Sequence, residues 1–417
     1  MNILKLLENT NYTIAYLLPI SIIAGSFIAD LSISLIGIIF VIISIVKKNF
    51  QYFFSTPVIF FWIWCAYLLV NSLFSNNILL SLESSLFYFR FGFFTLGIWY
   101  ILDNNHNFKK NFLFILICIF IILFFDGFLE FFYGTNLLNH EYNNQRIQSF
   151  FGDNQVIGSY LARLLPLMFA LFYSEFPKTN KSILFFMFLL IGTDLLVYLS
   201  GERTSFFIVG MVSICIIVLT SKYRLIRLAT FFISASLILL VTYNKDNIKE
   251  RMIDHTIQQT NILEEESNIF SERHESFYRT SFNIFIDNPL FGIGPKLYRE
   301  YCDDKDYSVG KSCSSHPHNT YMQLLAETGI IGTLPVIFLF FYICYVFIRQ
   351  IYSNFFTKHK FYNDHLICLY IALFVTLWPF MPSQNVFNNW TSILYYLPIG
   401  FILYEHSKQS KEDNGKD

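Results

Sequence analysis

Long apolar runs recur along the whole chain and are separated by polar segments. A helix needs about 20 mostly apolar residues to cross a bilayer, and this pattern predicts about twelve such helices. They cover residues 12–29, 32–46, 57–75, 84–102, 112–132, 156–174, 182–199, 204–220, 228–243, 327–347, 365–382 and 389–405. We therefore expect an all-α polytopic membrane protein.

Two connections between the predicted helices are much longer than the others. They cover residues 133–155 and 244–326, and loops longer than about 15 residues are usually functional or disordered. The longer one carries Phe277, Phe282 and Ile286 at helical spacing, which predicts that it folds. The chain then divides into helices one to nine at 1–243, one large loop at 244–326, helices ten to twelve at 327–405 and a polar tail at 406–417.

Basic residues lie in alternate connections and indicate the sidedness of the helices. If the N-terminus is inside, the inner segments carry Lys and Arg and the short outer connections are poor in both, as the positive-inside rule requires. The inner positions include Lys47, Lys48, Lys109, Lys110, Lys222, Arg224, Arg349, Lys408 and Lys411. Both termini are thus expected in the cytoplasm, and the large loop on the outer face.

Composition excludes two further classes of protein. Hydrophobic residues make up 54% of the chain and charged residues 14%, against about 25% charged residues in a soluble domain. High hydrophobicity argues against a disordered chain. The net charge of −1 gives no basic excess for nucleic acid, so we expect no nucleic-acid partner.

The cysteines divide into two groups. Five lie within or next to apolar segments, whereas Cys302 and Cys313 lie together in the large loop. In an oxidising compartment these two would form a disulfide, and the alternative is a pair of unpaired thiols. The sequence has no Cys or His spacing typical of a metal site, so we expect no metal.

The segment 314–332 has the sharpest chemical signal. Pro317 disfavours helix at the residue before it, so a helix should begin near His318 and Asn319, at the outer membrane surface. His318 could cap or hydrogen-bond the loop, or it could act as a general base without any metal.

Charged residues elsewhere on the outer face are weaker candidates. Glu202 and Arg203 occupy a very short outer connection, where they form either a mutually neutralising turn or a ligand clamp. Arg146 lies in the shorter outer loop, and Asp126 lies near the outer end of the fifth helix. Asp126 could serve function or could pair with Arg163 for structure.

A third segment, 272–299, predicts a helix with a tight Gly-rich end. Arg273 begins it, and Asn288-Pro289 followed by Gly292 and Gly294 would end it. The Gly-rich stretch lacks the strand and helix that a phosphate-binding loop needs. We interpret it as the turn that returns the loop to the membrane.

In this order, the three segments resemble the O-antigen ligase and O-antigen polymerase family of bacterial envelope glycosyltransferases. The matching pieces are Gly201–Arg203, the stretch from Arg273 to Gly294, and Pro317–Asn319 with Glu327–Gly332 downstream. The resemblance covers about residues 185–345. One departure is Phe277, where the family often has Trp.

This resemblance implies a GT-C-like, metal-independent, inverting glycosyltransferase in the bacterial inner membrane, with its active site facing the periplasm and no cofactor. Its partners would be an undecaprenyl-diphosphate-linked glycan donor, a lipid A-core or glycan acceptor, and membrane lipids. By position, Arg203 and Arg273 look like arginines that contact the diphosphate, and His318 looks like the essential histidine. Arg279 would be a less certain third cation, and Glu202, Asn319, Arg146 and Asp126 are the remaining substrate-binding candidates.

Other functions remain open from the sequence. A polymerase would use a second lipid-linked glycan as acceptor, and the single dominant loop favours the ligase. A transporter or flippase would show inverted repeats or helices broken in matching halves, which the sequence lacks. A structural scaffold would not need arginines on the outer face, so it ranks last.

Overall fold

The computed structural model describes residues 3–143, 145–177, 179–222, 224–260, 270–357 and 360–414. Helices dominate these residues, and the expected all-α class is confirmed for them. The helices are α1 (Ile3–Ala24), α2 (Ser26–Lys47), η1 (Gln51–Phe54), α3 (Thr56–Leu73), α4 (Ile78–Ser85), α5 (Arg90–Asn104), α6 (Phe108–Tyr133), η2 (Ser149–Asn154), α7 (Ile157–Glu175), α8 (Asn180–Leu199), α9 (Arg203–Leu219), α10 (Arg224–Asn244), α11 (Asp246–Lys249), η3 (Glu250–Asp254), α12 (His255–Thr260), α13 (Glu272–Asp287), α14 (Tyr298–Tyr301), α15 (Thr320–Phe356), α16 (Asp364–Thr376) and α17 (Asn389–Asn414).

Each of the twelve predicted spans overlaps one of these helices. By length and composition, eight helical segments of the described chain could cross a membrane: α2, α3, the stretch Ile78–Asn104, α6, α7, α8, α10 and α15. α9 and α16 are apolar but shorter. The protein is therefore a polytopic membrane protein, and the number of twelve crossings stays a prediction.

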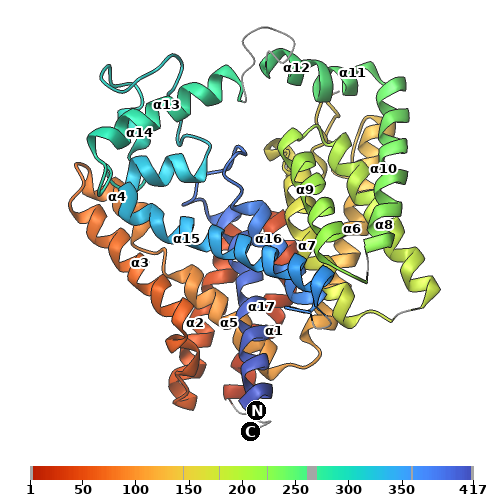
Figure 1. Cartoon of the computed structure of the whole chain (residues 1–417), viewed down its shortest axis with the longest axis horizontal. Helices are drawn as coiled ribbons and strands as arrows, with labels where there is room; N and C mark the ends of the chain where they lie inside the picture. The colour runs from red at the N-terminus through yellow and green to blue at the C-terminus, as the bar shows by residue number, and fades with distance from the viewer. Residues whose placement is uncertain are drawn as a thin grey trace.

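Figure 1 shows the arrangement of the bundle. Both termini lie at one end, and α11, α12 and α13 lie at the opposite end, which we call the loop end. α11 to α14 all belong to the predicted large loop, which therefore folds as helices in its described part. Residues 261–269 of that loop and 415–417 of the predicted tail lie outside the described residues.

Two helices form the centre of the bundle. α7 and α16 are buried along most of their length and pack against each other. α7 also contacts α6, α8 and α9. A helix that is apolar on all sides fits the core of such a bundle, as it would fit the hydrocarbon of a bilayer. The start of α7 is consequently held firmly at the loop end, where it carries polar side chains.

The large loop is fastened to the start of α15 by the Gly-rich turn. As expected, α13 ends before this turn, where Gly292 and Gly294 adopt φ of +65° and +112°. The N–H of Gly294 donates to the carbonyl of Glu327 at 2.8 Å. α15 kinks at Gly329, where φ is +62° and any side chain would meet the carbonyl of Leu290. Glycine is needed there because both the left-handed backbone and the close approach exclude a side chain.

Candidate active site

A cavity of about 360 Å³ is present where six separate stretches of chain meet. Its volume falls in the range of small-molecule sites, roughly 300–1,000 Å³. The lining residues are Arg146, Asn154, Val156, Ser159, Arg163, Gly201, Glu202, Arg203, Thr204, Ser205, Arg251, His318, Pro382, Ser383 and Gln384. Four of them are arginines and one is a histidine, so the cavity is strongly cationic.

Glu202 and Arg203 do not neutralise each other. The carboxylate of Glu202 accepts hydrogen bonds from the N–H groups of Gly158 at 2.6 Å and Ser159 at 3.1 Å, and from the hydroxyl of Ser205 at 2.9 Å. These backbone groups belong to the first turn of α7, which has no intrahelical acceptor for them. Glu202 therefore caps α7, and the interpretation of the two residues as a mutually neutralising turn is wrong.

Gly201 sets the shape of the turn beside Arg203. Its φ is +71°, and a side chain there would meet the carbonyl of Gln145. The turn can thus lie directly against the shorter outer loop, which brings Arg146 into the same cavity. The close contact between Gly201 and Gln145 therefore places their neighbours in the sequence, Arg203 and Arg146, in the same cavity.

The arginines of the cavity have neutral hydrogen-bond partners. Arg203 Nη1 donates to the hydroxyl of Thr256 at 3.2 Å, and Arg251 Nε donates to the carbonyl of Gly201 at 3.2 Å. Arg146 Nη2 donates to a backbone carbonyl at 3.0 Å. Burial and the like charges of Arg203 and Arg146 lower the pKa of Arg251. Positive charge gathered in this way is suited to a phosphate or carboxylate, whose oxygens match the guanidinium fork.

Arg163 is the most buried of the four arginines. It lies on α7, its exposed fraction is 5%, and its Nε and Nη1 have no hydrogen-bond partner in the part of the chain that the structure describes. The suggested pairing with Asp126 is wrong. Asp126 instead accepts from the N–H of Leu137 at 2.8 Å and the hydroxyl of Ser149 at 2.6 Å. Asp126 thereby braces the shorter outer loop and does not line the cavity.

His318 enters the cavity from the start of α15. Its φ is +55°, a left-handed conformation that only a few per cent of non-glycine residues adopt, histidine more often than most. The N–H of Ser383 donates to its carbonyl at 2.8 Å and helps to hold this conformation. Its ring lies against that of Phe277, with 5.2 Å between centroids, and 6.0 Å from the ring of His274.

Asn319 supports the helix that follows His318. Its side-chain oxygen accepts from the N–H groups of Tyr321 at 3.0 Å and Met322 at 3.1 Å, which is the geometry of an N-cap. Its amide nitrogen donates to the carbonyl of Pro379 at 2.8 Å. The expected helix start is confirmed, but both polar atoms of Asn319 already serve the fold.

The environment keeps His318 neutral. Burial, followed by the charges of His274 and Arg273, lowers the pKa of His318 to about 4. Burial and the charge of His318 lower the pKa of His316 to about 3. A histidine with a low pKa keeps a free lone pair at neutral pH and can accept a proton.

The two other predicted cations differ in position. Arg273 is exposed at the start of α13, with its guanidinium 5.6 Å from the ring of Phe277, and its charge reaches His318. It lies beside His318 but is not part of the cavity lining. The side chain of Arg279 is 65% exposed and pairs with Glu275 one turn away on the same helix. The structure does not bring Arg279 to the cavity.

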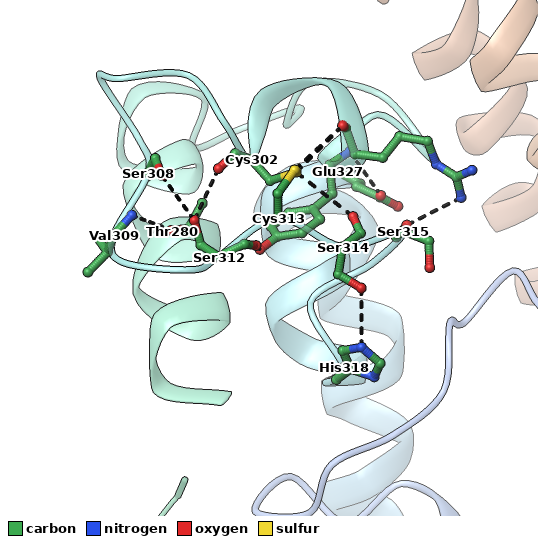
Figure 2. The surroundings of a disulfide bond; sticks show 12 residues. Thr280, Cys302, Ser308, Val309, Ser312, Cys313, Ser314, Ser315, His318 and Glu327 are labelled. Atoms are coloured by element: carbon green, nitrogen blue, oxygen red, sulfur yellow. Dashed lines mark hydrogen bonds between the residues drawn. A yellow bond between two sulfur atoms is a disulfide. The ribbon is translucent and has the colours of Figure 1, made fainter. Parts of the chain in front are cut away.

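The predicted disulfide is confirmed by the structure. Cys302 and Cys313 are bonded, and their Cα atoms lie 4.8 Å apart. Figure 2 shows the bond above the loop that leads to His318. The covalent link therefore joins the α14 region to the segment that carries the histidine.

Sequence reasoning missed several residues of this site. Arg251 was not singled out, because among the mixed charges around it the residue reads as part of a solvated helix. Arg163 is a weaker candidate in the sequence, as an arginine that enters the sixth predicted span and could pair with Asp126. The available signal was an arginine inside an apolar run, which marks a functional candidate by default. His274, next to Arg273 in the sequence, was also overlooked.

Together, these features define a membrane protein with a cavity lined by four arginines and a neutral histidine. Residues 185–337 match the family model described as O-antigen ligase. The family resemblance is thereby confirmed over this segment, which contains Arg203, Arg251, Arg273 and His318, whereas Arg146 and Arg163 of the cavity lie outside it. It supports a function of the O-antigen ligase or polymerase type in general. No curated protein matches the chain.

Proposed function

We propose that the protein is a glycosyltransferase that moves a glycan from an undecaprenyl-diphosphate-linked donor to a lipid A-core acceptor. The observation that carries the proposal is the cavity itself, in which Arg146, Arg163, Arg203 and Arg251 have neutral or missing partners beside His318. Glu202 is the one carboxylate of this lining, and its oxygens accept from the start of α7, so the arginines outnumber it four to one.

The arginines would bind the diphosphate of the donor. Negative charge grows on the diphosphate as its bond to the anomeric carbon breaks, and donors already aimed at that charge stabilise the transition state. Removing one such donor typically lowers kcat by about 10²–10³-fold. Four guanidinium groups supply the positive charge that a divalent cation provides in other transferases. Arg273, beside His318, would contact the diphosphate or the sugar next to it.

His318 would activate the acceptor. The acceptor oxygen attacks the anomeric carbon, its proton moves to the neutral imidazole, and the bond to the diphosphate oxygen breaks with its electron pair. Direct displacement from the opposite side inverts the configuration at the anomeric carbon. The lowered pKa of His318 keeps the ring neutral at neutral pH, so its lone pair is free to accept the proton.

The sidedness of the reaction follows from charge and redox chemistry. The basic connections favour cytoplasmic termini by the positive-inside rule, and these termini lie at the end opposite to α11–α13 (Figure 1). A disulfide in the large loop favours an oxidising compartment. Both arguments support an active site that faces the periplasm from the inner membrane.

The test uses purified protein in detergent, a radiolabelled lipid-linked donor and a lipid A-core acceptor. A transferase forms labelled product in detergent, whereas a transporter cannot, because transport needs a membrane. Arg203→Ala, Arg273→Ala and His318→Ala should each lose most of the transfer. Arg224→Gln is the matched control, since Arg224 begins α10 at the opposite end and bonds carbonyls there. Wild-type turnover in any of the three variants would remove that residue from the mechanism.

The acceptor is tested in a strain that lacks the protein. If all long-chain lipopolysaccharide is lost while polymeric lipid-linked glycan remains, the protein is the ligase. A single repeat on lipid A-core would instead identify a polymerase that uses a second lipid-linked glycan. The single large loop at 244–326 favours the ligase.

A further inference from the structure

The loop in front of His318 is tied at several points to the α14 region. The disulfide joins Cys302 to Cys313, and the hydroxyl of Ser312 donates to the carbonyl of Cys302 at 3.0 Å. The hydroxyl of Tyr298 donates to the carbonyl of Ser312 at 2.7 Å. Ser312 and Cys302 are both fully buried. Residues 312–313 are thus fixed by one covalent bond and two buried hydrogen bonds.

The residue directly after the disulfide contacts the imidazole. The hydroxyl oxygen of Ser314 lies 3.3 Å from Nε2 of His318, as Figure 2 shows. The carbonyl oxygen of Ser314 lies 3.9 Å from the sulfur of Cys302. The next residue, Ser315, is held as well, because Arg299 Nη2 donates to its carbonyl at 3.2 Å. Ser314 therefore stands between the bonded cysteines and the histidine.

The other side of this contact is also held in place. His318 keeps its left-handed backbone through the hydrogen bond from Ser383, and its ring packs on Phe277. In the described part of the chain, the ring of His318 has one side-chain hydrogen bond, and its partner is Ser314. A neutral imidazole has two tautomers, and the partner of one nitrogen decides which nitrogen keeps the lone pair.

We propose that Ser314 is a positioning residue for His318 and that the Cys302–Cys313 disulfide fixes Ser314 in place. The hydroxyl oxygen of Ser314 accepts the Nε2–H of neutral His318, which leaves the lone pair on Nδ1. This inference rests on the proposed function, in which His318 takes the proton of the acceptor hydroxyl. That proton moves to Nδ1, the acceptor oxygen bonds the anomeric carbon, and the diphosphate leaves with its electron pair. The imidazolium so formed still donates from Nε2 to Ser314, so the contact persists through the step.

A neighbouring serine offers a matched control. The hydroxyl of Ser315 lies 3.0 Å from Nδ1 of His316, a pair of the same chemistry one residue along. Ser315 is exposed and does not line the cavity, and its tie to Arg299 runs through its carbonyl, which alanine retains. Substituting Ser315 thus removes a serine–histidine contact at His316, whose ring lies 4.1 Å from that of His318, and leaves the contact between Ser314 and His318 in place.

The first experiment compares Ser314→Ala, Ser314→Thr and Ser315→Ala in the purified full-length protein. Ser314→Ala should lower kcat by about 10- to 100-fold, the usual penalty for a misplaced reacting group. The donor KM should stay near the wild-type value, because the arginines are intact. Ser314→Thr keeps the hydroxyl and should restore kcat, and Ser315→Ala should match the wild type. Equal kcat in Ser314→Ala and Ser315→Ala would overturn the proposal, as would a loss that threonine fails to restore.

The second experiment tests the disulfide. Reductant should lower the kcat of the wild type with little change in donor KM, and a Cys302→Ser/Cys313→Ser double variant should show the same low kcat. Reductant should have no further effect on the double variant, since the remaining described cysteines are free. A double variant with wild-type kcat would remove the disulfide from the proposal.

The His318→Ala variant separates this inference from the proposed function. If His318→Ala is inactive while Ser314→Ala is fully active, the inference fails and His318 remains the base. If His318→Ala transfers at the wild-type rate, the assignment of the base fails, and the positioning role fails with it.

Discussion

Lowering the pH should leave kcat/KM almost constant until well below pH 5. His318 must be neutral to accept a proton, and burial together with the charges of His274 and Arg273 lowers its pKa to about 4. An unperturbed histidine has a pKa of about 6.5. Because the folded pKa lies below the unfolded one, the neutral and active form is present above pH 4 and is lost as the pH falls through that value.

The expected difference is large at mildly acidic pH. At pH 5.5, a pKa of about 4 leaves roughly 97% of the ring neutral, whereas a pKa of about 6.5 leaves about 9% neutral. The two cases therefore differ by about tenfold in the active fraction. The same shift makes the unfolded chain bind a proton before the folded protein does, so this histidine lowers stability as the pH drops below about 6.5.

The assay measures kcat/KM of the purified protein between pH 5 and pH 8, because this ratio reports groups of the free enzyme. The diphosphate of the donor stays ionised throughout this range. Melting temperatures at each pH control for unfolding, and His318→Gln should have a small residual rate without an acid limb. A tenfold fall between pH 7.5 and pH 5.5, with an inflection near pH 6.5, would refute the reasoning.

Four further substitutions test the roles of charged residues in and near the cavity. Arg251→Gln and Arg163→Gln should each lower kcat/KM for the donor by about 10²–10³-fold in initial-rate measurements, while Arg224→Gln should match the wild type. Glu202→Gln should destabilise the protein by about 1–3 kcal/mol in reversible unfolding, because the N–H groups at the start of α7 lose a charged acceptor; an unchanged midpoint would contradict the capping role. Asp126→Asn should lower the free energy of unfolding by a similar amount, since Asp126 accepts hydrogen bonds from Leu137 and Ser149. The KM of this variant for the donor should stay unchanged, and a raised KM would show that Asp126 does contribute to the site.

The helices could be predicted because the bilayer imposes a simple pattern. About 20 apolar residues, bounded by charged residues or by Pro and Gly, identify a membrane-spanning helix without knowledge of the helices packed around it. The start of α15 after Asn319 and the end of α13 before the Gly-rich turn were predictable from local capping and turn chemistry. The start of α1 and the end of α17 were predicted less accurately, since both helices continue into polar residues that hydropathy alone excludes.

The roles of the polar residues depend on distant partners and could not be read locally. Glu202 caps a backbone 44 residues away, and Asn319 holds a carbonyl 60 residues away. The segments that carry Glu202 and Asn319 do form the site, but the two side chains accept hydrogen bonds from the N–H groups at the starts of α7 and α15. Conversely, Arg163 and Arg251 join the cavity only because six stretches of chain meet there. Sequence indicates which residues are unusual, and the packing of the bundle decides which of them meet.

The most direct test measures donor binding and glycan transfer together in one variant. His318→Ala should bind the lipid-linked diphosphate donor with wild-type affinity and transfer almost none of its glycan, because the cationic cavity remains and the proton acceptor is gone. Arg203→Ala, measured beside it, should lose donor affinity. Transfer at the wild-type rate by His318→Ala would contradict the central claim.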